Sequence, residues 1–224
     1  MPHFARWLYR RVRGDLGRRV LDAGAGIGTY SELLAEDGCA VVAVESVEAF
    51  VRRLQERFAG RDRIAVIQAD LAVPHGLPDF EAADSVLCLN VLEHIQDDVQ
   101  ALRNIHARVE EGGRLIALVP AHPRLFNSMD RALGHYRRYG TRQFLERLAQ
   151  GGWQVDRCFH VNAFGLPGWF VAGSLLKRRA PGRDLTALFD RLLPVFSVLE
   201  ETFVRGAFGL SIVASCRRID SPTT

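Results

Sequence analysis

The chain has 224 residues, of which 48% are hydrophobic and 25% are charged, and a formal net charge of +3. This composition is typical of a globular protein. Its four cysteines are far apart and form no C-x-x-C pair, which argues against a zinc site and a disulfide framework. No run approaches the roughly 18 apolar residues of a membrane span. We therefore expect one domain over residues 1–224, in a reducing cytoplasm.

The first segment, residues 1–16, is predicted to form an N-terminal helix with a basic face. Residues 1–20 contain six arginines and one acid, Asp15, whereas the rest of the chain is slightly acidic. Such a helix either packs on the domain, lies on a membrane surface or touches an anionic substrate. We favour packing, because surface helices usually bury one apolar stripe, which here comprises Phe4, Trp7, Leu8 and Val12.

Apolar runs alternate with helical patterns through the first 120 residues. The predicted strands are 18–23, 40–45, 63–68, 84–90 and 113–119, and the predicted helices are 4–14, 29–37, 47–58 and 95–109. This alternation predicts right-handed β-α-β units and a parallel sheet. Ligands bind beyond the carboxyl ends of such strands. Those ends carry Asp22, Glu45, Asp70, Asn90 and Pro120, so one rim is predicted to hold the site.

The first strand runs into a glycine turn, residues 20–28, with the sequence Val-Leu-Asp-Ala-Gly-Ala-Gly-Ile-Gly. Glycines allow the backbone to approach a ligand closely. The third glycine, Gly28, comes one position too early for the dinucleotide pattern G-x-G-x-x-G, and Asp22 would repel a pyrophosphate. A cationic ligand without phosphate fits better, and S-adenosylmethionine is the obvious candidate.

Glu45 closes the second predicted strand, about 20 residues beyond the glycines. An acid at this position binds ribose hydroxyls in nucleotide-binding α/β folds. The alternative is a solvated acid at a strand end. The preceding glycine turn favours the ligand interpretation.

Four motifs in this order resemble those of class I S-adenosylmethionine-dependent methyltransferases, and of a bacterial small-molecule subgroup among them. They are the segments 22–28, 45, 68–71 and 90–94, and the resemblance covers roughly residues 15–160 and the last strand. It implies an α/β, Rossmann-like fold. That fold has a mostly parallel seven-stranded sheet with helices on both faces, an antiparallel last strand and, here, a helical insert between the last two strands.

The resemblance implies S-adenosylmethionine as the cofactor and S-adenosylhomocysteine as its product. It assigns the methionine end of the cofactor to Asp22 and the glycines, the ribose to Glu45, and the adenine to Asp70 and Leu71. Asn90 stands where the family lines the sulfonium region. The complete predicted cofactor set is Asp22, Gly24, Ala25, Gly26, Gly28, Glu45, Ser46, Asp70, Leu71, Asn90 and Val91.

Glu93 and His94 match the end of a Glu-x-x-Glu-His stretch that is associated with a divalent metal in ubiquinone-biosynthesis O-methyltransferases. Asn90 replaces the first glutamate of that pattern. One carboxylate and one imidazole are too few for a dependable metal site. The sequence therefore predicts no metal, and it predicts that Glu93 and His94 cap the next helix.

Residues 121–140 are predicted to form a long substrate loop rich in polar and aromatic side chains. The loop is similar to one found in the bacterial subgroup. Its histidines His135 and His122, followed by His94, are the candidate catalytic bases, because imidazole titrates near neutral pH. Each of them can instead serve as a structural hydrogen-bonding group. The predicted substrate-binding set is Asp130, Tyr136, Arg137, Arg138, Tyr139 and Trp169.

A further helix is predicted at 142–149, and the last two strands at 153–160 and 209–217. Residues 162–206 between these strands are predicted to form a helical insert. A lid over a lipophilic substrate, a dimer surface, a membrane-facing patch and plain core packing all suit its apolar residues. A basic cluster, 177–179, follows Trp169 and Phe170 and favours an interface.

The leading hypothesis is methyl transfer to a small, lipophilic acceptor, at oxygen in preference to carbon or nitrogen. The alternatives are an RNA methyltransferase and a non-catalytic, cofactor-binding partner protein. The short, N-terminal basic patch and the absence of an RNA-binding module argue against a nucleic-acid partner. Peripheral membrane contact is left open, as is the choice between monomer and homodimer.

Overall fold

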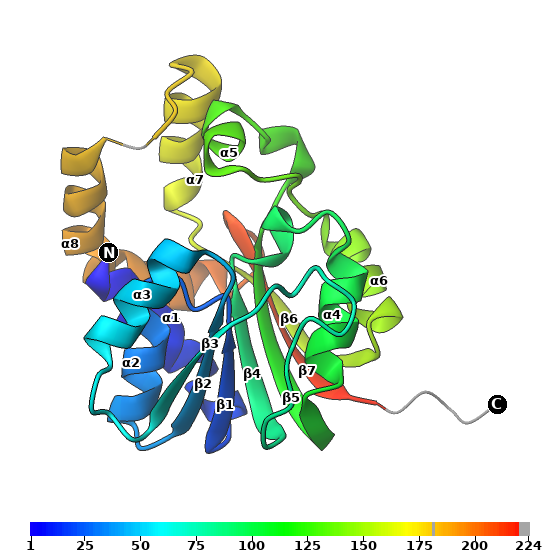
Figure 1. Cartoon of the computed structure of the whole chain (residues 1–224). Coiled ribbons are helices and arrows are strands. Elements are labelled where there is room, and N and C mark those ends of the chain that lie inside the picture. The colour runs from blue at the N-terminus through cyan, green and yellow to red at the C-terminus, as the bar shows by residue number, and fades with distance from the viewer. Residues whose placement is uncertain (181, 220–224) are drawn as a thin grey trace.

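The computed structural model describes residues 1–180 and 182–219, and a seven-stranded sheet forms its centre (Figure 1). The strand order is β3-β2-β1-β4-β5-β7-β6. Only β7 runs antiparallel to its neighbours, β5 and β6. This arrangement confirms the predicted Rossmann-like sheet. The strands are β1 (Arg19–Ala23), β2 (Ala40–Glu45), β3 (Ile64–Gln68), β4 (Ala83–Leu89), β5 (Val109–Pro120), β6 (Trp153–Val161) and β7 (Ser211–Arg218).

Helices cover both faces of the sheet because neighbouring residues of a strand point to opposite sides. Leu21 in β1 packs in the cluster with Leu102 and Phe144, whereas Val20 packs in the cluster with Leu8 and Leu54. The first face is covered by α4 (Asp98–His106) and α6 (Thr141–Gln150). The other is covered by α1 (Pro2–Val12), α2 (Thr29–Glu36), α3 (Glu48–Arg57) and the second half of α8 (Arg183–Leu199).

The N-terminal helix packs on the domain, as predicted. Trp7, Leu8 and Val12 are buried in α1, while its arginines reach solvent or half-buried positions. The Trp7 indole Nε1 donates to Glu201 Oε1 at 3.0 Å, and the Phe4 amide donates to Asp190 Oδ1 at 3.0 Å. These bonds tie the start of the chain to the insert near its end.

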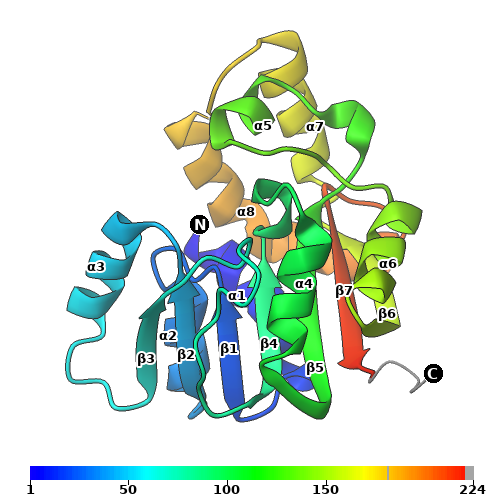
Figure 2. The same ribbon diagram turned by 45° about the vertical axis from the view of Figure 1, so that its right-hand side comes forward.

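The insert is helical, as expected. It contains α7 (Gly165–Trp169), η4 (Phe170–Leu175), α8 and η5 (Glu200–Val204). The first part of it stands beside α5 (Ser128–Leu133), above the carboxyl ends of the strands, in both views (Figures 1 and 2). Residue 181 of the insert lies outside the described residues.

The segment 121–140 is more ordered than a loop. It contains η3 (Pro123–Leu125) and the helix α5. The Asn127 side chain accepts from the Met129 amide, and Asp130 Oδ2 accepts from the Asn127 amide at 2.9 Å. This reciprocal capping box starts α5 within a segment whose polar composition indicates a loop.

None of the helices in the described ranges combines the length and the apolar character that a membrane crossing requires.

Candidate functional site

A cavity of about 830 Å³ lies at the carboxyl ends of β1, β2 and β4, within the size range of small-molecule sites. Its walls come from the glycine turn, the ends of β2 and β4, and the segment after β3. Leu133 and Tyr136 of the 121–140 segment complete them. Most of the predicted cofactor residues therefore meet in one place. Those that line the cavity are Gly24, Gly26, Glu45, Ser46, Asp70, Leu71, Asn90 and Val91.

A second cavity, of about 900 Å³, lies between α1, α2 and α8. It shares no lining residue with the first and contains none of the predicted site residues. Size alone does not select the functional site. The convergence of motifs from several strand ends does.

The carboxylate of Glu45 holds the glycine turn in place. Its Oε2 accepts from the Gly26 amide at 2.9 Å, and its Oε1 accepts from the Ser46 and Val47 amides at 2.9 Å each. The residue is only 8% exposed. Since a carboxylate has about four acceptor positions, roughly one stays free toward the cavity. Glu45 thus shapes the turn as well as facing the site.

The three turn glycines have left-handed backbones, with φ of +76°, +55° and +80° at Gly24, Gly26 and Gly28. They serve different purposes. A Cβ on Gly24 would lie 2.5 Å from Val91 Cγ2, and one on Gly28 would lie 2.6 Å from the Phe58 ring. A Cβ on Gly26 would meet nothing within 4 Å. Gly26 alone of the three leaves open space, and it lines the cavity.

Asp22 lies behind the turn. It is 4% exposed, and its Oδ2 accepts from the Ser31 hydroxyl at 2.5 Å. Burial raises the pKa of Asp22 to about 6, although the bond from Ser31 opposes this. Asp22, Ala25 and Gly28 are not among the cavity-lining residues. Direct contact between these three and a cofactor stays a prediction.

Asn90 directly follows β4, and its backbone is in the left-handed region with φ of +55°. Asparagine tolerates this conformation better than most residues. On the opposite wall, Asp70 uses Oδ1 to accept from the Ala72 amide at 2.8 Å, which leaves its second oxygen available. Asn90 and Asp70 thus face one cavity from two strand ends.

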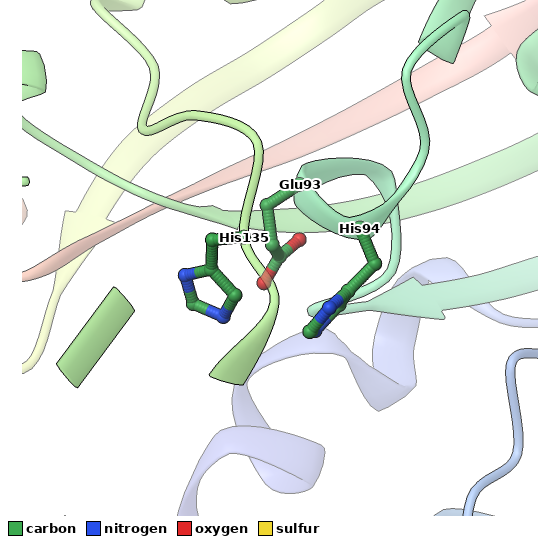
Figure 3. Close-up of side chains that lie close together, drawn as sticks. All are labelled: Glu93, His94 and His135. Atoms are coloured by element: carbon green, nitrogen blue, oxygen red, sulfur yellow. The ribbon is translucent and has the colours of Figure 1, made fainter. Parts of the chain in front are cut away.

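Glu93, His94 and His135 form a compact cluster beside the cavity (Figure 3). Glu93 points between the two imidazoles, whose ring centroids are 4.7 Å apart in an edge-to-face arrangement. His94 also lines the cavity, as does Tyr136, the residue after His135. The structure therefore brings two of the three predicted bases together.

Burial controls the charge state of this cluster. The Glu93 carboxyl is fully buried, and neither of its oxygens has a hydrogen-bond partner among the described residues. Burial raises the pKa of Glu93 to about 8, so the carboxyl is protonated at neutral pH. Burial and the neighbouring His135 lower the pKa of His94, so that this imidazole is neutral at physiological pH.

Asp130 orients His135 from behind. Its Oδ1 lies 2.9 Å from His135 Nδ1 and 2.8 Å from Arg138 Nε. Burial alone would raise the pKa of Asp130, but the bonds from His135, Arg138 and Asn127 outweigh it and hold the pKa below its usual range. The ionised carboxylate favours a proton on Nδ1, which leaves a lone pair on Nε2.

Most of the predicted substrate residues have other partners. Arg138 is 3% exposed and its guanidinium lies over the Trp169 ring, 4.6 Å from the centroid. Tyr139 is fully buried and donates to Asp98 Oδ2 at 2.8 Å, where Arg137 also forms an ion pair at 2.9 Å. Of the predicted set, Tyr136 is the one that lines the cavity. Substrate contact by the others stays a prediction.

His122 lies in a different place. Its Nε2 is 2.9 Å from the Gly209 carbonyl oxygen, and its ring stacks on His160 at 5.7 Å. It lines a separate, smaller cavity with Leu125 and Leu166. The structure does not bring His122 to the cluster of Glu93, His94 and His135.

Glu93 and His94 do not cap the next helix, contrary to expectation. They form the short helix η2 (Leu92–His94), and α4 begins at Asp98. The Asp97 side chain caps α4 by accepting from the Gln100 amide at 3.0 Å. A residue with a stronger capping side chain, closer to the helix start, takes this role.

Several apolar residues of the cavity were not anticipated, among them Val47, Phe50, Ile95 and Leu133. Val47 and Phe50 lie at the start of α3 and are 49% and 40% exposed. The available signal is their position shortly after Glu45, on a helix whose other exposed residues, apart from Ala49, are polar.

The cluster also offers one potential metal-ligand atom from each of Glu93, His94 and His135, all within 4.8 Å of one another. Two imidazoles and a carboxylate form a donor set that divalent transition metals accept. His135 was not part of the two-residue pattern considered in the sequence. The expectation of a site without metal stays a prediction.

Comparison with known proteins identifies the fold. Residues 21–117 match the family described as a methyltransferase domain. A structure of an S-adenosylmethionine-dependent methyltransferase from Mesorhizobium loti superimposes with a TM-score of 0.65 at 15% identity, covering 95% of this chain and 98% of the other. Residues 21–117 are therefore similar to a methyltransferase domain, and the whole chain has the fold of the S-adenosylmethionine-dependent methyltransferase structure. The strand order and the reversed β7 are the features of this fold in the chain.

A ubiquinone biosynthesis O-methyltransferase of Pseudomonas aeruginosa is 30% identical to this chain over 129 residues. The match covers 56% of this chain and 54% of the relative, so the chain spans about half the length of the curated relatives it matches. The [4+2]-cyclase SpnF also superimposes, with a TM-score of 0.66 at 18% identity and coverage of 98% and 82%. The fold alone therefore leaves the reaction open.

Proposed function

We propose that this protein transfers a methyl group from S-adenosylmethionine to a small, lipophilic acceptor, at oxygen. The observation that carries the proposal is one cavity in which the glycine turn, Glu45, Asp70 and Asn90 meet the His94 imidazole. The cofactor motifs and a candidate base thus line the same cavity. The 30% identity to an O-methyltransferase over 129 residues supports oxygen as the target.

The cavity suits the proposed cofactor. Gly26 leaves space where a side chain would project, so the backbone can approach the methionine end. Glu45 keeps about one acceptor position for a ribose hydroxyl, and Asp70 keeps one oxygen for the exocyclic amine of adenine. Val47 and Phe50 offer apolar surface against which adenine can lie.

Bound S-adenosylmethionine supplies a methyl group on a positive sulfonium, which is already activated for transfer. The protein's task is to hold the acceptor in line and to accept a proton from its hydroxyl. His94 faces the cavity as a neutral imidazole and is the first group placed to accept that proton.

His135 lies next to His94 but does not line the cavity, so it acts on the reaction through His94. Asp130 keeps the proton of His135 on Nδ1, so Nε2 points a lone pair toward the cluster. Burial raises the pKa of Glu93 to about 8, so its carboxyl beside the two rings is uncharged at neutral pH. The proton that leaves the acceptor hydroxyl is then held on the His94 imidazole and passes to solvent after transfer.

The cavity wall that contains His94 also presents apolar and aromatic side chains. Leu133 and Tyr136 line it and are 52% and 58% exposed, and Ile95 lies beside them. Such a surface favours a lipophilic acceptor whose reactive hydroxyl reaches His94. The four cysteines are free thiols, which supports a cytoplasmic location. Both a monomer and a homodimer are compatible with the site.

The test uses the purified full chain with methyl-labelled S-adenosylmethionine and an extract of host cells. Products are partitioned between organic solvent and water, and cofactor affinity is measured by calorimetry. Label in the organic phase supports the proposal. Label in RNA supports the RNA methyltransferase alternative, and tight cofactor binding with no transfer to any fraction supports a non-catalytic binding protein.

A further inference from the structure

Two segments that are far apart in the sequence form one lobe above the cavity. We call residues 121–140 and 162–180 together the cationic lobe. The Ser128 hydroxyl donates to the Gly173 carbonyl oxygen at 2.9 Å, and the Asn127 amide donates to the Ser174 hydroxyl at 3.4 Å. Arg138 stacks on Trp169 across the same boundary. The two segments are therefore packed together as one structural unit (Figures 1 and 2).

The exposed charges of this lobe all have one sign. The only acid in it is Asp130, which is fully buried and paired with Arg138. Its exposed cations form no ion pair with any residue in the described ranges 1–180 and 182–219. They are Arg124, Arg131, Lys177, Arg178 and Arg179.

Large apolar side chains are exposed next to these cations. Leu175 and Leu176 are 62% and 58% exposed and directly precede Lys177. Phe170 and Val171, one turn earlier, are 41% and 44% exposed. The chain turns back at Lys177, whose φ is +50°, so the two leucines and the basic triplet form the tip of the lobe. This tip is the part of the lobe farthest from the sheet in both ribbon views (Figures 1 and 2).

We propose that the tip of the cationic lobe docks on an anionic lipid surface, with Leu175 and Leu176 in the interface and Lys177, Arg178 and Arg179 on the headgroups. Apolar side chains flanked by unpaired cations are the pattern that binds such a surface. The lipid contact stands on its own and does not depend on methyl transfer.

Charge also argues against a second copy of this chain as the occupant. In a two-fold dimer the same patch faces itself, so the five cations of one copy would approach those of the other with no exposed carboxylate between them. A nucleic acid would satisfy the cations but would leave the exposed leucines in water. An anionic membrane satisfies both sets.

Docking at the tip would turn the carboxyl ends of the strands, and with them the cavity, toward the membrane. Leu133 and Tyr136, which belong to the lobe, line the cavity, so the surface that binds lipid and the wall of the site are parts of one body.

The full-length protein is floated with vesicles of phosphatidylcholine alone and with vesicles containing about a third phosphatidylglycerol. We expect binding to the anionic vesicles only, weakened by added salt. The triple variant Lys177→Gln, Arg178→Gln, Arg179→Gln should bind about a hundredfold more weakly, because each cation near an anionic surface contributes roughly fivefold. The double variant Leu175→Asn, Leu176→Asn should also lose most of the bound fraction.

Matched controls remove the same groups elsewhere. The triple variant Arg53→Gln, Arg63→Gln, Arg142→Gln removes three exposed charges outside the lobe, and Leu185→Asn, Leu188→Asn removes two exposed leucines of α8. Both should bind vesicles as the parent does. All variants should keep the parent's unfolding temperature and cofactor affinity, because the changed side chains are exposed and do not line the cavity.

Equal binding to neutral and anionic vesicles overturns the proposal, as does full binding by the tip variants. If the variant Leu185→Asn, Leu188→Asn loses vesicle binding, the lipid contact lies on α8 and the proposal for the tip is wrong. If the protein binds RNA but neither kind of vesicle, the partner of the tip is a nucleic acid and the lipid proposal is wrong.

Discussion

Asp130 Oδ1 lies 2.9 Å from His135 Nδ1, and this buried contact decides which nitrogen of the imidazole carries the proton. Arg138 binds the same carboxylate and keeps it ionised. The pair fixes His135 in one tautomer and one orientation beside His94 and Glu93. Asp130 of the 121–140 segment thus orients His135 beside Glu93 and His94, which follow β4.

Replacing either histidine of the cluster should slow methyl transfer without removing the cofactor. For His135→Ala and His94→Gln we expect kcat to fall by roughly a hundredfold, the usual contribution of a general base. The affinity for S-adenosylhomocysteine should stay within about threefold of the parent. The readouts are steady-state kinetics and calorimetry.

The matched control for these variants is His75→Asn. His75 is exposed and has a φ of +58°, which asparagine tolerates. It should keep full activity. If His122→Ala abolishes transfer while both cluster variants remain active, the base lies near Gly209 and the cluster assignment is wrong.

Two substitutions in the glycine turn should separate binding from folding. In Gly26→Ala the new methyl group enters the cavity, so cofactor affinity should fall at least tenfold while most of the fold's stability remains. In Gly28→Ala the methyl group would lie 2.6 Å from the Phe58 ring, so we expect a loss of about 2–4 kcal/mol of stability. Urea unfolding and calorimetry on both variants measure the two quantities. Equal loss of stability in both would contradict this division of roles.

The buried Glu93 carboxyl should make stability depend on pH. Its pKa is raised from 4.5 to about 8 in the folded protein, so its contribution is complete below pH 4.5 and is lost as the pH rises through about 8. We expect Glu93→Gln, which cannot ionise, to gain stability relative to the parent as the pH rises from about 4.5 to about 8. The measurement is urea unfolding of both proteins across this range. A parent-to-variant difference that is independent of pH would show that Glu93 is already ionised.

Removal of metal should leave methyl transfer unchanged. Burial keeps the Glu93 carboxyl protonated at neutral pH, because it raises the pKa of this group to about 8, whereas a metal ligand must be deprotonated. Activity is compared before and after dialysis against a chelator, with metal content measured by mass spectrometry. Loss of activity that a divalent cation restores would mean that Glu93, His94 and His135 close around an ion.

Local features of the sequence predicted the sheet and the cofactor side of the site. Apolar periodicity places strands within a few residues, because the side chains of a buried strand must all be apolar. The spacing of Gly24, Gly26 and Gly28 predicts the turn, since their positive φ is a local requirement. Glu45, Asp70 and Asn90 were predictable as neighbours because parallel strands end at one edge.

Only the tertiary structure decided how residues from distant segments combine. It places His135 beside Glu93 and His94 but leaves His122 at Gly209, although both histidines come from the same segment with the same chemistry. It buries the single acid of the cationic lobe and exposes that lobe's cations. These outcomes depend on packing between segments that the chain's local pattern does not relate, so composition and spacing along the sequence contain no signal for them.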